Sequence, residues 1–556
     1  MNQTETPGRR RALVTATAVL TALATVAGLG FLATTISPSM ASTPDAASAS
    51  AAAELDQPGL TPVPPSTSAS TSSTASAEPS AEGALAGTPL AGIKNVVFVL
   101  ADDLDWELFR QVPRLAALQD EGMTFTNHTV TDSLCCPSRT SIMRSQYIHN
   151  HLVISNTAAT GGGWPTFRSR GEQYDCLPVW LSNAGVSTAL FGKYLNDYPQ
   201  TPRSARYVPP GWSKWAVPVS RGDSYTGYNY VLNDNGRLRA YGKAPSAFLN
   251  DVITTKTTDF IRTAPDGFFV TLSTYNPHKP APVAVRNRGT HAATVAPRNP
   301  SYNSVGANEP TWMRGFGALP MWKQEHLDRL WRKRAQSAES VADSIDAIKA
   351  TLQETGRADD TLIVVTSDNG YHVGTHRLSN GKRTAYHEDT VVPMVIIGPG
   401  VTPGTTIEAM TSTIDLGPTF AAILGASVPG WVDGRSLTDI VGTGTVPPTW
   451  RNATLSESMG MSGPEDPDYQ PQAPPPFSAL RSQDYLFVVY RNGERELYDL
   501  KSDPYEMNNI ASTADPRLVA GLYSQLQALR ACTGDTCRTA DAIALAGPVS
   551  TPAPSS

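Results

Sequence analysis

The chain contains 556 residues, which is too long for one ordinary domain and leaves ample sequence to bury a large core. Its 44 lysines and arginines are outnumbered by 50 aspartates and glutamates, so the net charge is −6. Without a basic excess, nonspecific binding to a nucleic-acid backbone is disfavoured, and we expect no nucleic-acid partner. Five cysteines exclude a small disulfide-stapled protein, and their odd number raises the question of what the unpaired one does.

The N-terminal segment, residues 1–41, has the pattern of an export signal. Arg9–Arg11 precede a charge-free run from Ala12 to Pro44, which is apolar from Ala12 to Leu32 and then contains Ser39-Met40-Ala41, small at both ends. We therefore predict cleavage after Ala41 and a secreted, extracellular protein. Because the apolar run exceeds a usual signal core, an uncleaved membrane anchor is the alternative, and only that would give a stable membrane partner. Residues 42–92, rich in Ala, Ser, Thr and Pro, are predicted to be a disordered linker.

From Ile93 onward, apolar runs of strand length end abruptly in polar, chemically reactive residues. Five such runs are Asn95–Leu100, Ser187–Phe191, Gly267–Ser273, Thr361–Thr366 and Val392–Ile397. Continuous apolar strands are typical of a parallel sheet that is buried on both faces. Segments between them, such as Leu177–Ala184 and Gln336–Leu352, have helical spacing. The alternation predicts an α/β layered domain.

In open α/β sheets, ligands bind beyond the carboxyl ends of the strands, so the residues after the first four runs should meet in one crevice. These residues are Asp102, Asp103, Lys193, His278, Asp368 and Asn369. The two acidic pairs among them offer hard oxygen ligands and neither sulfur nor imidazole, which favours Ca²⁺ or Mg²⁺ over zinc. One such pair alone is more often a set of solvated loop carboxylates. Two pairs at strand ends of one sheet favour a metal site.

A further group of reactive residues lies between Ser133 and His151. The string Cys135-Cys136-Pro137-Ser138-Arg139 is predicted to begin a helix, because proline is tolerated in the first turn. Both cysteines would then lie at the positive end of that helix, where anions bind and thiols gain acidity. From the residues alone, Cys135 and Cys136 are either a thiol nucleophile site or members of a disulfide.

The string CCPSR resembles the Cys-x-Pro-Ser-Arg signature of type I sulfatases, in which the first cysteine is oxidised to formylglycine. Other blocks resemble the branch that contains the N-acetylglucosamine-6-sulfatases and the extracellular heparan endosulfatases. In chain order these blocks read ADDLD, FGKYLND, VPPGW, NPHKP, APRNPSYN, SDNGYHVGTH, GKRTAYHED and ELYDLKSDPYEMNN. The resemblance implies an alkaline-phosphatase-like layered α/β domain with a mixed, mostly parallel central sheet, and a smaller C-terminal α+β domain.

The resemblance also implies roles for single residues. Cys135 would become formylglycine through a formylglycine-generating enzyme, a partner during maturation. Arg139 would hold the formylglycine hydrate, Lys193 and Lys382 would neutralise sulfate oxygens, and His278 would bind sulfate and assist the leaving oxygen. The implied ligands of Ca²⁺, with Mg²⁺ as the alternative ion, are Asp102, Asp103, Asp368, Asn369 and the modified Cys135.

One block departs from the family pattern. Many arylsulfatases read Gly-Lys-x-His where this chain has Gly192-Lys193-Tyr194-Leu195, so the histidine thought to deprotonate the hydrate is missing at its usual place. Four other residues are candidates to help there or to bind substrate, although each histidine is equally expected as a satisfied loop or core residue. They are His149, His151, Asn196 and His372.

Toward the C-terminus, Tyr485–Tyr490 and Glu496–Leu500 flank an Asn-Gly hairpin signal, and Pro516–Cys532 has helical spacing. These elements match the family's C-terminal domain. The Pro-, Ser- and Thr-rich end of the chain is predicted to be disordered. The predicted divisions of the chain are an export signal at 1–41, a linker at 42–92, a catalytic domain at 93–445, a C-terminal subdomain at 446–545 and a tail at 546–556.

An exported chain meets an oxidising compartment, so Cys532 and Cys537 are predicted to form a disulfide. Pairing of Cys136 with Cys176 would account for the odd cysteine count once Cys135 is modified. Three tryptophans are candidates either for stacking on sugar rings or for the core. They are Trp164, Trp212 and Trp215.

Together these patterns predict an exported sulfatase that hydrolyses sulfate esters, with sugars such as N-acetylglucosamine-6-sulfate as small-molecule or glycan substrates. A sulfate ester is anionic, so cations must surround it. A serine nucleophile would remain as a stable sulfated ester, whereas a formylglycine hydrate has a second hydroxyl that can expel the sulfate. Two alternatives remain: a phosphonate or phosphodiester hydrolase of the same superfamily, and a non-catalytic protein that binds sulfated glycans.

Overall fold

The computed structural model describes residues 85, 87–219, 223–460, 463, 466 and 468–544. The predicted export signal, nearly all of the predicted linker and the C-terminal tail lie outside these residues. Within the described part of the chain, no helix combines the length and the apolar character needed to cross a bilayer.

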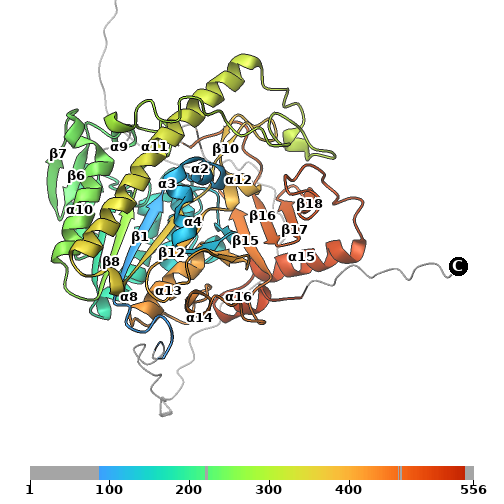
Figure 1. The fold of residues 1–556 in the computed structure, drawn as a ribbon. Helices are drawn as coiled ribbons and strands as arrows, with labels where there is room; N and C mark the ends of the chain where they lie inside the picture. Colours follow the sequence, from blue (N-terminus) through green and yellow to red (C-terminus); the bar gives the residue numbers. More distant parts are fainter. Residues whose placement is uncertain are drawn as a thin grey trace, which may run out of the picture. The chain divides into compact units, whose positions relative to one another are not determined.

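Ten strands form one mixed sheet in the order β13-β2-β12-β9-β1-β8-β4-β5-β6-β7 (Figure 1). In that order, their bounds are Thr405–Ile407, Met123–Phe125, Met394–Ile397, Thr361–Ser367, Asn95–Ala101, Phe268–Ser273, Ser187–Gly192, Lys214–Pro218, Val231–Asp234 and Arg237–Ala240. The neighbours β9, β1, β8, β4 and β5 are all parallel, whereas β12, β6 and β7 join by antiparallel pairing. The predicted mixed, mostly parallel sheet is confirmed.

One predicted strand runs in the opposite direction from the others. β12 pairs antiparallel with β9, with Met394 opposite Thr366 and Ile397 opposite Ile363. Its continuous apolar run indicates a strand that is buried on both faces, and this pattern is the same for parallel and antiparallel strands. Because β12 is antiparallel, the residues that follow it lie at the edge of the sheet opposite to the residues that follow β9.

Helices cover both faces of the sheet (Figure 1). Val97 and Val99 of β1 belong to a core with the helices of one face, which are α2 (Trp106–Gln111), α10 (Leu249–Thr263) and α11 (Met321–Glu354). Val96 and Phe98 point to the other face, into a core with α5 (Cys135–Arg144), α8 (Leu177–Asn183), α13 (Leu416–Ile423) and α14 (Thr438–Thr443). The predicted helix at Gln336–Leu352 is the C-terminal half of the longer α11.

Short elements connect these layers. They are α3 (Pro113–Ala116), α4 (Leu118–Glu121), β3 (His128–Thr129), α6 (Ile148–His151), α7 (Gly163–Ser169), α9 (Asp223–Thr226), β10 (His372–Val373), β11 (Asn380–Gly381), α12 (His387–Thr390) and β14 (Thr411–Ser412).

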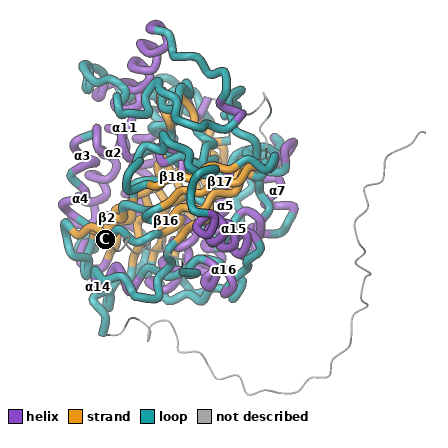
Figure 2. The backbone as a smooth tube through the Cα atoms, turned by 90° about the vertical axis from the view of Figure 1, so that its right-hand side faces the viewer, coloured by secondary structure: helices purple, strands orange, loops and turns teal. Residues whose placement is uncertain are grey.

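A second, smaller sheet follows near the C-terminus, and Figure 2 shows β16, β17 and β18 close to α15. Its four antiparallel strands are β15 (Ala453–Ser458), β16 (Phe477–Ser482), β17 (Tyr485–Tyr490) and β18 (Arg495–Asp499). Leu480 and Phe487 pack against Leu522 and Leu526 of α15 (Pro516–Arg530). The predicted hairpin and helix are therefore confirmed.

Of the two predicted cysteine pairings, one is confirmed and the other is wrong. Cys532, in the connection between α15 (Pro516–Arg530) and α16 (Asp535–Ala540), forms a disulfide with Cys537 of α16. The pairing of Cys136 with Cys176 is wrong, because both are free. They are buried in an apolar cluster that also contains Trp164 and Trp215, where each thiol behaves as a small apolar side chain.

A buried arginine ties the small sheet to the large domain. Arg451 precedes β15 and donates two hydrogen bonds to Asp415, at 2.6 and 2.7 Å, and one to Asp541 at 2.9 Å. The side chains of Arg451 and Asp415 have no solvent exposure. Removing the arginine would leave two buried carboxylates with less compensation, and such losses cost about 3–5 kcal/mol.

We therefore expect Arg451→Met to lower the free energy of unfolding by about 3–5 kcal/mol, measured by denaturant titration. Arg517→Met is the matched control, because Arg517 is exposed near the start of α15. An unfolding curve for Arg451→Met that coincides with the control would contradict this role.

Candidate active site

Four parallel strand ends deliver reactive side chains to one edge of the large sheet. The ends of β1, β9, β8 and β4 lead respectively to Asp102 and Asp103, Asp368 and Asn369, His278, and Lys193. All six side chains are buried. The structure thus brings together the residues that the sequence placed in one crevice.

Cys135 lies among them as the first residue of α5. Leu134, the N-cap residue, is extended and makes no side-chain cap, and Pro137 lies in the first turn. The Cys135 Sγ is 2.8 Å from Lys382 Nζ and 3.5 Å from Asp102 Oδ1. The side chain at position 135 therefore faces both a cation and a carboxylate, at the positive end of a helix.

The prediction that the helix start makes this thiol more acidic is wrong. Burial raises the pKa of the Cys135 thiol well above its usual value, and the nearby charges of Lys193 and Lys382 only oppose that effect. Burial likewise raises the pKa of Cys136 to about 12. Desolvation outweighs the helix terminus, so an unmodified thiol here is protonated at neutral pH and is a weak nucleophile.

Buried ion pairs connect the strand ends to the residues around Cys135. Lys193 Nζ is 2.8 Å from Asp102 Oδ1, Lys382 Nζ is 2.6 Å from Asp103 Oδ1, and Arg139 Nε is 2.7 Å from Asp368 Oδ2. Each member of these pairs is at most 4% exposed. Buried charges persist only when they are paired in this way.

The cations of the cluster stay charged. Burial is the largest single effect on the pKa of Lys193 and lowers it, but Asp102 and the other negative groups around the ammonium together hold that pKa well above its usual value. Burial also lowers the pKa of Lys382, and Asp103 and Asp468, with the other negative groups nearby, together raise it well above its usual value. For His278, the carboxylates around it overcome burial and raise its pKa above the ordinary value. The site thus holds protonated groups that can bind an anion.

The donor set fits a hard divalent cation. Asp102, Asp103, Cys135 and His278 have donor atoms within 4.8 Å of one another. Asp368 and Asn369 lie beside Asp103: Asp368 Oδ1 accepts its backbone N–H at 3.2 Å, and Asn369 Nδ2 donates to its Oδ1 at 2.7 Å. Asp103 Oδ2, 3.6 Å from His278 Nε2, and Asn369 Oδ1 are buried and accept no hydrogen bond from the described residues. Such oxygens are the ligands that Ca²⁺ and Mg²⁺ prefer.

Two residues that the sequence did not indicate also reach the site. Asp468 Oδ1 is 3.0 Å from His278 Nε2, and Asp468 Oδ2 is 3.2 Å from Lys382 Nζ. Asn156 Nδ2 donates to Asp468 Oδ2 at 3.0 Å, and Asn156 Oδ1 accepts the Cys136 N–H at 3.0 Å. Neither residue follows a strand of the large sheet, so no strand-end pattern pointed to them.

His149 and His151 lie apart from this cluster. His149 Nδ1 is 2.6 Å from Glu457 Oε2, and its Nε2 is 3.0 Å from the carbonyl oxygen of Cys532. His151 is buried, with its Nε2 2.9 Å from Ser141 Oγ. Both rings are held by structural partners, and the geometry gives no support to a role of either in binding substrate.

His372 and Asn196 are the other two candidates that the sequence offered. His372 Nδ1 is 3.0 Å from Asp389, and β10, which begins at His372, pairs with β11 immediately before Lys382. Asn196 follows the Lys193 segment, and its backbone carbonyl accepts the N–H of Trp164 at 2.7 Å. These contacts position neighbouring segments of the chain.

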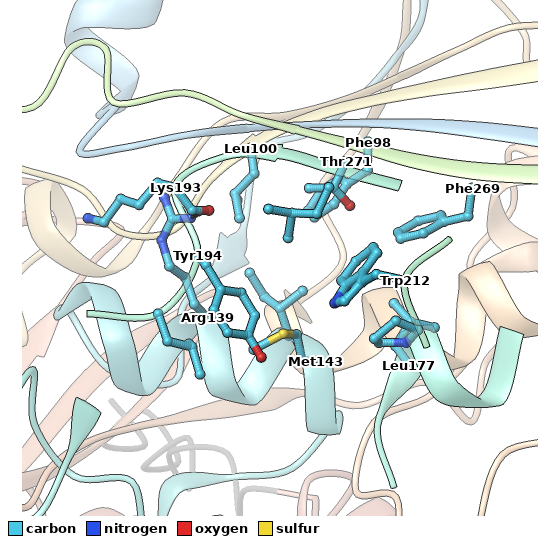
Figure 3. Close-up of a pocket in the computed structure, with 14 residues that line it drawn as sticks. Phe98, Leu100, Arg139, Met143, Leu177, Lys193, Tyr194, Trp212, Phe269 and Thr271 are labelled. Atoms are coloured by element: carbon cyan, nitrogen blue, oxygen red, sulfur yellow. Dashed lines mark hydrogen bonds between the residues drawn. The ribbon is translucent and has the colours of Figure 1, made fainter. Parts of the chain in front are cut away.

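Behind the charged cluster lies an apolar cavity of about 40 Å³, drawn in Figure 3. Arg139 and Lys193 border it on one side, and Leu177, Trp212 and Phe269 on the other. Its lining is apolar, so it supports the packing of the two cations and does not resemble a site for an anion. Trp212 belongs to this packing.

The other two tryptophans proposed for sugar stacking are core residues. Trp164 and Trp215 are fully buried. Trp164 packs edge-on against Tyr198 at 5.1 Å between ring centroids, and Trp215 against Tyr194 at 5.0 Å. The alternative of a core role is therefore confirmed for both.

Comparison with solved structures shows the same fold. A structure described as a complex with its substrate D-glucosamine-2-N,6-O-disulfate has a TM-score of 0.67 at 21% identity, covering 81% of this chain and 99% of that chain. The phosphonate monoester hydrolase of Agrobacterium radiobacter has a TM-score of 0.61 at 21% identity, covering 79% and 95%. The alkaline-phosphatase-like fold class predicted from the sequence is confirmed.

Comparison with sequences shows the family. The family model described as Sulfatase matches residues 94–426, and the one described as N-sulphoglucosamine sulphohydrolase, C-terminal, matches residues 374–532. The N-acetylglucosamine-6-sulfatase of Homo sapiens is 34% identical over 478 residues, which cover 80% of this chain and 86% of that protein. The extracellular sulfatase SULF-1 homolog of Drosophila melanogaster is 31% identical over 66% of this chain and 33% of that protein. A family match over more than half of the chain, with a charged cluster around Cys135, identifies the chain as a member of the sulfatase family, a sulfuric ester hydrolase.

Proposed function

We propose that this chain is an exported sulfatase that removes sulfate from sugar esters resembling N-acetylglucosamine-6-sulfate, through a formylglycine at Cys135 and a divalent cation. The observation that carries the proposal is the position of Cys135: it begins α5, 2.8 Å from Lys382 Nζ, within a buried cluster of cations at the strand ends. An anionic ester needs such an arrangement, because fixed positive charges stabilise the charge that moves onto the leaving oxygen.

The position of Cys135 favours modification over direct thiol chemistry. Its thiol is protonated, because burial raises its pKa well above the usual value. An aldehyde formed there by a formylglycine-generating enzyme would supply, as its hydrate, an oxygen nucleophile that can later expel sulfate. The Sγ atom stands in for those oxygens, so Lys382 and Asp102 would be the side chains that orient them.

The remaining residues have separable roles in this proposal. Lys193 and Lys382 neutralise the ester oxygens, and Arg139 keeps the modified residue in place while it binds Asp368. His278, whose pKa is raised above its ordinary value by the carboxylates around it, donates a proton to the departing sugar oxygen. Each role requires the charge state that the structure gives the residue.

The cation is proposed to be Ca²⁺, with Mg²⁺ as the alternative, held by the oxygens of Asp102, Asp103, Asp368 and Asn369 together with position 135. When bound, such an ion polarises an ester oxygen and adds positive charge beside the nucleophile. The buried oxygens Asp103 Oδ2 and Asn369 Oδ1, which accept no hydrogen bond from the described residues, support this assignment.

The substrate class follows from the relatives. The human and Capra hircus proteins named N-acetylglucosamine-6-sulfatase cover 80% of this chain at 33–34% identity. The structural neighbour with a bound glucosamine disulfate points in the same direction. The competing phosphonate hydrolase proposal has only the shared fold in its support, at 21% identity.

Export and the predicted domain limits remain part of the proposal. The signal at 1–41 lies outside the described residues, and the extracellular sulfatase homologues of Drosophila melanogaster and Caenorhabditis elegans support secretion. The catalytic domain at 93–445 and the subdomain at 446–545 are proposed on the sequence blocks.

The activity is tested with matched aryl sulfate, aryl phosphate and phosphonate monoester substrates, followed by N-acetylglucosamine-6-sulfate. We expect sulfate release to exceed phosphate and phosphonate cleavage in kcat/KM, because the relatives are sulfatases. Preferential cleavage of the phosphonate monoester would replace the proposal with its competitor.

Cys135→Ser should lower kcat by on the order of 10⁴-fold or more, because a serine cannot expel the sulfate that it captures. Cys136→Ser is the matched control and should retain turnover, since Cys136 is free and points into an apolar cluster. Mass spectrometry of the tryptic peptide should show formylglycine at position 135 in active enzyme. Unmodified Cys135 in fully active enzyme, or normal turnover by Cys135→Ser, would defeat the mechanism.

Chelation should abolish activity, and added Ca²⁺ or Mg²⁺ should restore it. Asp368→Ala should also lower the bound metal measured by elemental analysis, because it removes a charged oxygen ligand. Asp359→Ala is the control, since Asp359 is exposed just before β9, at the opposite end of the strand. Full metal content in Asp368→Ala would contradict the ligand assignment.

A further inference from the structure

We infer that Asp468 selects ligands by charge: its carboxylate favours a monoanionic ester over a dianion in the cluster around Cys135. The inference rests on the proposed function, since it assigns a specificity residue to the same site. Asp468 comes from the segment between β15 and β16, and its side chain enters a site otherwise built by the large sheet and α5.

The carboxylate of Asp468 is held among three donors. Oδ1 is 3.0 Å from His278 Nε2, while Oδ2 is 3.2 Å from Lys382 Nζ and accepts from Asn156 Nδ2 at 3.0 Å. Oδ2 is also 3.6 Å from Cys135 Sγ. Asp468 is 8% exposed, so little solvent screens its charge.

The backbone N–H of Asp468 and the side chain of Gln470 are also held by hydrogen bonds. Its N–H donates to Asp466 Oδ1 at 2.9 Å, and Asn156 Nδ2 reaches the same Asp466 oxygen at 3.2 Å. Two residues on, the Gln470 amide meets the backbone of Lys382, accepting its N–H at 2.7 Å and donating to its carbonyl at 3.2 Å. The carboxylate is therefore anchored beside Lys382 and is not a freely rotating surface group.

Asp468 shares its cations with the proposed ester. Lys382 is assigned to the ester oxygens and His278 to the departing sugar oxygen, so an ester bound to them meets a fixed negative charge within a few ångströms. Repulsion between two charges grows in proportion to the charge of the ligand. A ligand of charge −2 is therefore penalised more than one of charge −1.

The reaction itself changes this ligand charge. A sulfate monoester carries one negative charge. Its hydrolysis consumes one water, breaks the S–O bond to the sugar oxygen, gives that oxygen a proton as the alcohol leaves, and releases sulfate as a dianion with one proton to solvent. A phosphate monoester, by contrast, is close to a dianion at neutral pH before it reacts. The same carboxylate thus excludes phosphate monoesters and speeds the departure of product sulfate.

Asp468→Asn removes the charge and keeps the shape of the side chain. We expect the inhibition constants of inorganic sulfate and phosphate to fall about tenfold, which corresponds to about 1.4 kcal/mol, while KM for an aryl sulfate changes much less. The ratio of kcat/KM for the aryl phosphate to that for the aryl sulfate should rise about tenfold. Asp468→Glu keeps the charge and should keep the discrimination of the unaltered enzyme.

Asp466→Asn is the matched control. Asp466 supports the same segment, and its substitution keeps the Asp468 charge beside Lys382. It should leave both ratios unchanged. Equal changes for monoanions and dianions in Asp468→Asn, or no change for either, would overturn the inference. A drop in selectivity in Asp466→Asn equal to that in Asp468→Asn would also overturn it, by showing that the segment and not the charge matters.

Calorimetry separates this inference from the proposed function. Methyl sulfate is a monoanionic probe and inorganic sulfate a dianionic one, and neither needs turnover to bind. An enzyme that releases no sulfate from any ester would defeat the proposed function. If Asp468→Asn in that enzyme still gains affinity for inorganic sulfate and not for methyl sulfate, charge selection by Asp468 stands on its own.

Discussion

The parallel pairing of β1 with β8 on one side and with β9 on the other positions the two acidic pairs and His278 of the site. Parallel neighbours bring their carboxyl ends to one edge, so the residues after β1, β8 and β9 approach without any long loop. β4 extends the row and adds Lys193. β12, which is antiparallel to β9, shows the converse, since the residues after it lie at the other edge.

Charge balance is the second constraint, and it reaches beyond the strand tips. Asp103 adopts a left-handed backbone conformation (φ 64°), and Arg334 of α11 holds that turn by donating to its carbonyl and, at 3.0 Å, to Asp105 Oδ2. On the other face, Ser138 of α5 donates to the Asp368 carbonyl at 2.5 Å. Helices on both faces therefore hold the two acidic loops by hydrogen bonds. A buried carboxylate without such partners would lower the stability of the fold.

Much of this arrangement could be predicted from the sequence. The runs at Asn95–Leu100 and Thr361–Thr366 indicated buried strands, because their apolar residues are continuous. The polar residues that follow such runs then predicted most of the charged cluster. Asp468 could not be found this way: it lies 333 residues from Cys135 in a segment without periodic pattern. The free state of Cys136 and Cys176 was equally hidden, since spacing along the chain does not fix the distance between side chains.

The burial of Cys135 sets an order of events in the life of the protein. In the folded chain its side chain has no solvent exposure, and α5, the strand tips and Asp468 surround it. If Cys135 is oxidised as proposed, the modifying enzyme must reach it before these elements close around it. A chain that folded before modification would be well ordered but inactive, and only unfolding would make Cys135 accessible to the modifying enzyme again. On the proposed mechanism, modification of Cys135 would therefore have to precede the folding of these elements.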